Sequence, residues 1–152
     1  MIKYAMGFLN KLSSLFGNTA KTNIPVAPTT PVKKVLIVED DKYLRDVYSE
    51  LIKSEGYNVL TAENGQIGLQ TVLSQKPDII LLDLMMPVMD GKTMLHQLRS
   101  MEEFKKTPVV ILTNAGDAES MRQTQFFDNA NAFLIKSNIT PDDIVKEIKT
   151  FV

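Results

Sequence analysis

The chain has 152 residues, of which 44% are hydrophobic and 23% are charged, and this composition predicts one globular domain with little room for a second. It contains no cysteine, which excludes disulfide scaffolds, thiolate catalysis and cysteine-based metal sites. The net charge of −1 gives no general attraction for nucleic acid, so we expect no nucleic-acid partner.

The charges are distributed unevenly along the chain. Five of the 17 basic residues and none of the 18 acidic residues lie within residues 1–34, which leaves 12 basic against 18 acidic residues in the remainder. The first segment therefore carries a net charge of +5 and the remainder −6. This asymmetry predicts a basic appendage on an acidic compact domain.

Residues 1–17 are predicted to form a short amphipathic helix, because apolar side chains recur at steps of three and four residues. Asn10 and Lys11 interrupt the apolar stretch, which is too short for a membrane span and lacks the continuous core of an export signal. We therefore expect a cytoplasmic protein. The apolar positions are Ile2, Ala5, Met6, Leu9, Leu12, Leu15 and Phe16.

Residues 18–32 are predicted to be an extended linker, because prolines fix the backbone at three closely spaced positions. A lone helix of this length is marginal in water, so the amphipathic segment is expected to order only against a surface. A protein partner or the domain itself is favoured over weak membrane binding and over plain disorder. The three prolines are Pro25, Pro28 and Pro31.

From residue 33 onward, short β-branched runs alternate with segments of helical periodicity. The predicted strands are residues 35–38, 58–60, 79–82, 109–112 and 132–135. The predicted helices are residues 41–55, 65–75, 90–103, 117–128 and 140–151. Most of the strands are apolar at every position, which indicates a parallel sheet buried on both faces. We therefore predict an α/β fold, a doubly wound five-stranded parallel sheet of order 2-1-3-4-5 with helices on both faces.

Polar residues stand where the predicted strands end, which is where ligands bind in doubly wound sheets. Glu39 and Asp40 follow the first strand and Asp83 the third, while Thr113 and Lys136 follow the fourth and fifth. With strands one and three adjacent, the three carboxylates converge, so either some are protonated or a cation lies among them. Because only oxygen ligands are offered, the expected ion is Mg²⁺, with Mn²⁺ as a substitute.

Other interpretations of these acidic residues were weighed. They can be helix N-caps and solvated loop residues, and this structural role is assigned to Asp41. A nucleotide site at the first strand end requires glycines that let the backbone approach phosphate, and none is present there. A haloacid-dehalogenase-like phosphatase requires a second aspartate two residues after the first, whereas Asp83 is followed by Leu84 and Met85.

The segments Val35-Leu-Ile-Val-Glu-Asp-Asp41 and Asp83-Leu-Met-Met-Pro-Val-Met-Asp-Gly91, followed by Thr113 and Lys136, resemble the receiver domain of two-component response regulators. The resemblance covers residues 33–152. It implies a CheY-like, flavodoxin-like fold and a signalling phosphoacceptor rather than an enzyme with turnover.

The resemblance also implies roles for single residues. Asp83 would accept a phosphoryl group from a sensor histidine kinase or a phosphotransfer protein. Glu39, Asp40, Asp83 and the backbone carbonyl of Met85 would hold Mg²⁺. Lys136 would contact the phosphoryl oxygens.

Two further positions would carry the switch. Thr113 would hydrogen-bond the phosphoryl group and shift inward, and Phe133 would turn into the space that it leaves. An ordinary core phenylalanine is the alternative for Phe133.

Three positions depart from the usual pattern of the family. Glu39 replaces the more common aspartate and lengthens the ligand arm by one methylene. Ser137 replaces the usual proline, so the usual cis peptide bond is not expected there. Asn114 replaces a small residue and narrows access to the phosphoryl group.

The sequence thus predicts a stand-alone receiver that signals to an unknown protein target. Its rivals are a receiver-like scaffold indifferent to phosphate and, more weakly, a metal-dependent hydrolase, for which no general base is visible. His96, the only histidine, is expected at the surface, and the methionines of residues 85–101 are expected to fill the core.

Overall fold

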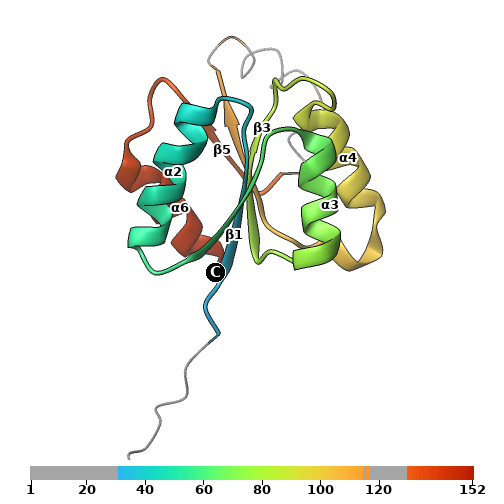
Figure 1. Ribbon diagram of the computed structural model, residues 1–152, viewed down its shortest axis with the longest axis horizontal. Helices are drawn as coiled ribbons and strands as arrows, with labels where there is room; N and C mark the ends of the chain where they lie inside the picture. The colour runs from blue at the N-terminus through green and yellow to red at the C-terminus, as the bar shows by residue number, and fades with distance from the viewer. Residues whose placement is uncertain (1–30, 115, 117–129) are drawn as a thin grey trace, which may run out of the picture. The chain divides into compact units, whose positions relative to one another are not determined.

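The computed structural model describes residues 31–114, 116 and 130–152 (Figure 1). The predicted helix at residues 1–17, nearly all of the predicted linker at residues 18–32 and the predicted helix at residues 117–128 lie outside the described residues. The division of the chain into a helix at residues 1–17, a linker at residues 18–32 and a receiver-like domain after them stays a prediction.

Five strands form one parallel sheet in the order β2-β1-β3-β4-β5, as the sequence predicts. Each predicted strand is present, and the second, third and fourth continue one or two residues beyond the predicted ends. Asp83 and Thr113 are therefore the last residues of their strands, whereas the sequence predicts them directly after the strands. The strands are β1 (Lys34–Val38), β2 (Asn58–Ala62), β3 (Ile79–Asp83), β4 (Val109–Thr113) and β5 (Ala132–Ile135).

Helices cover both faces of the sheet, and the doubly wound fold is confirmed. Helices α2 and α6 lie on one face, and α3 and α4 on the other (Figure 1). Each face has its own cluster of buried apolar side chains, to which alternate residues of the central strands contribute. The helices are α2 (Lys42–Ser54), α3 (Gly65–Gln75), α4 (Gly91–Ser100) and α6 (Pro141–Phe151), with a 3₁₀ turn η1 (Glu102–Phe104) after α4.

The predicted helix at residues 90–103 is too long. The helix ends at Ser100 because Met101 adopts an extended backbone, with φ −90° and ψ 118°. The last three predicted residues, 101–103, instead lead into and begin a separate 3₁₀ turn, which buries Phe104. Arg99 fixes this turn by donating to the carbonyl oxygens of Phe104 at 3.1 Å and Thr107 at 3.0 Å.

Burial divides the strands into central and edge strands. Every residue of β3 and β4 and the last four of β1 are buried, as their unbroken apolar runs predict. The edge strands β2 and β5 are mostly half-exposed or exposed. The carboxyl end of the buried central strands thus provides the enclosed edge on which a site is built.

Side-chain caps fix the helices that begin at this edge of the sheet. Asp41 accepts hydrogen bonds from the amides of Tyr43 and Leu44, so its predicted role as an N-cap is confirmed. Asp90 caps α4 by accepting from the amide of Thr93 at 2.7 Å. Because caps fix the entry of the chain into each helix, the loops that follow β1 and β3 are anchored at their far ends.

Within the described ranges, no helix is both long enough and apolar enough to cross a membrane.

Candidate functional site

The three predicted carboxylates converge at the carboxyl edge of the sheet. Glu39 follows β1 and Asp83 ends β3, and they are 1% and 3% exposed, whereas Asp40 is exposed. One carboxylate oxygen from each of the three lies within 4.8 Å of the others. Three like charges at this range repel strongly, so the cluster favours either protonation of a carboxyl group or a positive charge among the three.

Lys136, directly after β5, supplies a positive charge to this cluster. Its Nζ lies 2.7 Å from Oε2 of Glu39 and 2.9 Å from Oδ2 of Asp83, and its side chain is 11% exposed. Burial alone lowers the pKa of Lys136, but the two carboxylates outweigh this effect and raise the pKa above its ordinary value. The ammonium therefore stays charged between two buried carboxylates.

The carboxyl group of Glu39 is buried beside that of Asp83. Burial and the neighbouring Asp83 raise its pKa, and Lys136 opposes them only in part. Its Oε2 forms the ion pair with Lys136 but receives no well-aligned hydrogen bond from the described part of the chain. This buried oxygen belongs to a donor set of carboxylate oxygens alone, and such a set fits a hard divalent cation such as Mg²⁺.

Asp83 is held by its own loop. Its Oδ1 accepts a hydrogen bond from the amide of Leu84 at 2.7 Å, and the amide of Met85 lies 3.4 Å from the same oxygen. The amide of Gly91 donates to the carbonyl oxygen of Leu84 at 3.0 Å. A Cβ at Gly91 would lie 2.1 Å from the carbonyl oxygen of Asp83, so only glycine allows this approach.

The middle of this loop is a γ-turn anchored by helix α3. The amide of Met89 donates to the carbonyl oxygen of Pro87 at 2.8 Å, and Val88 between them has φ 69°. A positive φ is costly for a β-branched residue, so the turn persists because its surroundings hold it. One such contact is the hydrogen bond of 3.0 Å from the amide of Gly65 to the carbonyl oxygen of Met89.

Thr113 ends β4 and Phe133 lies on β5. These two strands are on the side of β3 that faces away from β1. Thr113 is buried, and its hydroxyl donates to the carbonyl oxygen of Asn114 at 3.3 Å. The amide of Lys136 donates to the carbonyl oxygen of Thr113 at 2.8 Å, which joins the ends of the two strands. Phe133 is half-buried and packs against the cluster on the α3 and α4 face.

Met85 differs from the expectation for the methionines. Its side chain is 58% exposed, whereas Met86 and Met94 are buried in the core as expected. The metal-binding role of its backbone carbonyl stays a prediction. His96 is exposed, as the sequence predicts. The described residues contain no cis peptide bond, including the bond that precedes Ser137.

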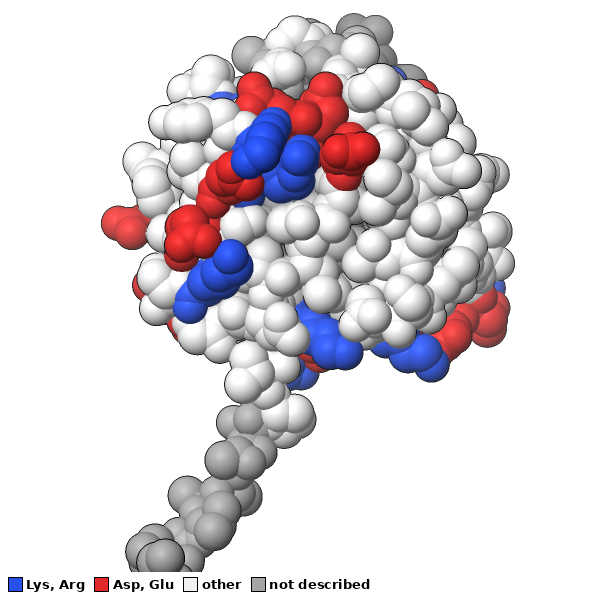
Figure 2. All heavy atoms as spheres, in the orientation of Figure 1, with Lys and Arg blue, Asp and Glu red and all other residues white. Residues whose placement is uncertain are grey.

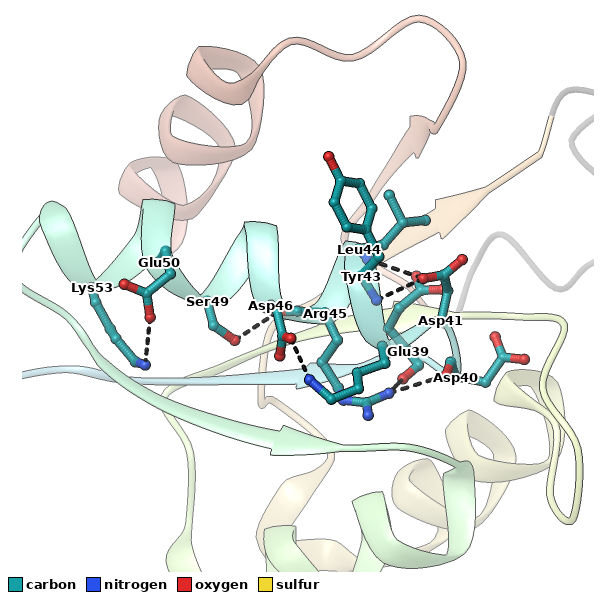
Figure 3. Close-up of polar contacts among 11 residues, drawn as sticks. Glu39, Asp40, Asp41, Tyr43, Leu44, Arg45, Asp46, Ser49, Glu50 and Lys53 are labelled. Atoms are coloured by element: carbon teal, nitrogen blue, oxygen red, sulfur yellow. Dashed lines mark hydrogen bonds and ion pairs between the residues drawn. The ribbon is translucent and has the colours of Figure 1, made fainter.

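Sequence reasoning missed Arg45 on α2. Its Nη1 donates to the carbonyl oxygens of Glu39 at 2.6 Å and Asp40 at 3.1 Å (Figure 3). Nothing in the position or spacing of Arg45 along the sequence indicates that its side chain reaches back to backbone carbonyls. The contact becomes visible only in three dimensions.

The family model described as the response regulator receiver domain matches residues 35–149. The chain belongs to this family. The predicted recognition is therefore confirmed, and the strand order and helix arrangement are those of a receiver domain.

Curated relatives contain receiver segments within longer proteins. The chain is 33% identical over 119 residues to the transcriptional regulatory protein ResD of Bacillus subtilis, a match that covers 78% of the chain and 48% of ResD. It is 34% identical over 103 residues to the sensor histidine kinase TmoS of Ectopseudomonas mendocina, covering 68% of the chain and 10% of TmoS. The chain thus spans half or less of the length of these relatives.

Solved receiver structures are similar along nearly their whole length. The chemotaxis response regulator CheY4 of Vibrio cholerae is 28% identical with a TM-score of 0.71, and the match covers 80% of this chain and 99% of CheY4. The response regulator TrrA of Thermotoga maritima, solved in complex with Mg²⁺-BeF, is 26% identical with a TM-score of 0.71. That match covers 80% of this chain and all of TrrA.

Proposed function

We propose that Asp83 is a phosphoacceptor that takes a phosphoryl group from a phosphohistidine on a sensor histidine kinase or a phosphotransfer protein. A carboxylate oxygen of Asp83 forms the new O–P bond while the N–P bond breaks, and the electron pair leaves with the histidine nitrogen. One observation carries the proposal: Asp83 is buried at a strand end, 2.9 Å from the ammonium of Lys136 and grouped with two further carboxylates.

In this proposal Glu39, Asp40, Asp83 and the backbone carbonyl of Met85 hold Mg²⁺, with Mn²⁺ as a substitute. When bound, the ion offsets the negative charge that builds up as an anionic carboxylate meets an anionic phosphoryl group. The oxygen-only donor set supports this assignment. The Mg²⁺-BeF complex of the similar protein TrrA is consistent with it.

The residues at the ends of β4 and β5 are proposed to contact the phosphoryl group and to respond to it. Lys136 exchanges a carboxylate contact for a phosphoryl oxygen, to which its charged ammonium donates. The hydroxyl of Thr113 donates to the carbonyl oxygen of Asn114 at 3.3 Å, and in the proposal it exchanges this long bond for one to the phosphoryl group. Phe133, half-buried on the next strand, then moves into the space that Thr113 leaves.

The proposal extends to the rest of the chain. Residues 33–152 act as the receiver, and output passes through protein contacts of this domain to a downstream target. Residues 1–17 are a docking helix for a protein partner, with weak membrane binding as the lesser role, and residues 18–32 are its tether. We place the protein in the cytoplasm, and nucleic acid is not among its proposed partners.

Intact-mass spectrometry after incubation with acetyl phosphate tests the proposal. We expect one phosphoryl group per chain when Mg²⁺ or Mn²⁺ is present and none with chelator, because the carboxylate cluster otherwise repels the donor. Asp83→Asn should abolish labelling, while Asp78→Asn, an aspartate at the other edge of the sheet, serves as the matched control. A wild-type protein that is never labelled would instead support the phosphate-independent scaffold.

A further inference from the structure

We infer that Arg45 is a positioning residue, which orients the acidic residues of the site by holding their backbone. The guanidinium Nη1 donates to two consecutive carbonyl oxygens, those of Glu39 at 2.6 Å and Asp40 at 3.1 Å. A single charged donor shared by two carbonyls restrains the main chain of both residues. The two acidic side chains therefore start from a restrained main chain.

The remaining contacts of this segment leave Arg45 as the main constraint on those two carbonyls. The amide of Glu39 donates to the carbonyl oxygen of Ala62 on β2 at 3.1 Å, so the segment is tied to the sheet at one end. Asp41 caps α2 and ties it to the helix at the other end. Between these anchors, Arg45 alone among the described residues donates to the carbonyl oxygens of Glu39 and Asp40.

Figure 3 shows the resulting arrangement. The guanidinium lies on one side of the segment, at the carbonyl oxygens, and the carboxylate of Asp40 points away from it. The carboxylate of Glu39 reaches the ammonium of Lys136 instead, at 2.7 Å. Arg45 therefore acts on the acidic side chains through the main chain, without touching their carboxylates.

A purely electrostatic role is the competing explanation, since α2 carries charges of both signs. Basic and acidic side chains also lie close together on the face shown in Figure 2. In the described ranges, however, Arg45 has no carboxylate within 4.0 Å, whereas Lys42 on the same helix pairs with Asp46 at 2.5 Å. The two explanations predict opposite effects. A nearby positive charge weakens the binding of a cation by Coulomb repulsion, so removal of a merely electrostatic Arg45 would tighten Mg²⁺ binding.

The first test is isothermal titration with Mg²⁺, and this arm rests on the metal site of the proposed function. For Arg45→Met we expect the dissociation constant of Mg²⁺ to rise about tenfold, as when groups that orient metal ligands are lost. Arg45→Lys should fall between wild type and Arg45→Met, because one ammonium keeps the charge but not the shape of the guanidinium. Lys42→Met, the matched loss of charge, should not weaken binding.

The second test uses the metal-free protein, so that it stands even if the wild type binds no Mg²⁺. The amide of Glu39 is the probe, because it donates to the carbonyl oxygen of Ala62 at 3.1 Å and belongs to the segment that Arg45 holds. Hydrogen exchange at this amide should be about tenfold faster in Arg45→Met, because the segment opens more often once its tie to α2 is lost. Exchange should be unchanged in Lys42→Met, and amides in the middle of α2 report whether the fold is intact. Tighter Mg²⁺ binding in Arg45→Met, or unchanged exchange at the amide of Glu39, would overturn the inference. If the wild-type protein binds no Mg²⁺ while exchange is faster in Arg45→Met, only the proposed metal site is overturned.

Discussion

Strands β3 and β5 both lead into the candidate site, but they are buried very differently. All five residues of β3 are buried, and the strand pairs with a neighbour on each side. All four residues of β5 are half-exposed, and the strand pairs only with β4. The phosphoacceptor candidate Asp83 therefore belongs to the most constrained part of the sheet, whereas Phe133 and Lys136 come from its edge.

This difference assigns separate tasks to the two strands. A nucleophile benefits from a fixed position, which a doubly paired strand with no exposed face provides. A switch requires an element whose alternative arrangement costs little, and such elements have few buried contacts. Under the proposed function, an edge strand is accordingly the better place for Phe133 and for Lys136, which would change partners.

The largest expected effect is on stability, and it tests whether β3 and β5 differ as their burial indicates. Leu81 on β3 and Leu134 on β5 pack into the same cluster, but only Leu81 is fully buried. We expect Leu81→Ala to lower the free energy of unfolding by about 2–5 kcal/mol and Leu134→Ala by about 1 kcal/mol, since the second site is already in contact with water. Urea unfolding followed by circular dichroism measures both, and equal losses would remove the distinction.

The second prediction concerns which side of the site binds the metal. Asp40→Asn should raise the dissociation constant of Mg²⁺ about tenfold, because it removes a charged ligand. Lys136→Met should not raise it at pH 8, because it removes a cation that competes for the same carboxylates. Glu63→Gln, an acidic residue after β2 that is not in the cluster, is the control. Isothermal titration suits this protein, which has no tryptophan. Equal weakening by Asp40→Asn and Lys136→Met would contradict the division.

A smaller effect is expected at the amino ends of the central strands, where Asp78 connects β1 and β3. Its Oδ2 accepts from the amide of Lys34 at 2.8 Å, and its Oδ1 pairs with Nζ of Lys33 at 3.1 Å. Burial raises the pKa of Asp78, but these two contacts outweigh it and hold the pKa below its ordinary value of 3.8. The tie thus stabilises the fold fully above that value and is lost as the pH falls through the lower, folded-state pKa.

Urea midpoints at pH 7 and at pH 3 measure this contribution. The loss of stability on acidification should be smaller in Asp78→Asn than in wild type, because the asparagine cannot be protonated. The effect should be modest, since the Asp78 side chain is one-third exposed and solvent screens its charge. An equal loss in both proteins would show that Asp78 does not link β1 and β3 electrostatically.

Much of this architecture was predictable from the sequence, because burial leaves a regular pattern. Strands that are covered on both faces must be apolar at every position, which identified β1, β3 and β4. The capping side chain of Asp41 marked where α2 begins. The convergence of the acidic residues followed once the strand order was predicted, because parallel strands end at one edge.

The remainder depends on contacts that no local pattern encodes. The end of α4 was misplaced because the backbone becomes extended at Met101 and a separate 3₁₀ turn follows, a change that no local pattern marks. Arg45 was missed because a guanidinium can reach many partners, and only the fold determines that these are the carbonyls of Glu39 and Asp40. The contact of Lys136 with Glu39, in addition to Asp83, depends in the same way on side-chain packing across three strands.

The most direct test of the account is to locate the phosphoryl group chemically. Reduction with borohydride after incubation with acetyl phosphate and Mg²⁺ converts an aspartyl phosphate to homoserine, which peptide mass spectrometry then places in the chain. The account predicts homoserine at position 83 in wild type, at the same position in Lys42→Met, and at no position when Mg²⁺ is chelated. Homoserine at another aspartate, or labelling that persists without a divalent cation, would contradict it.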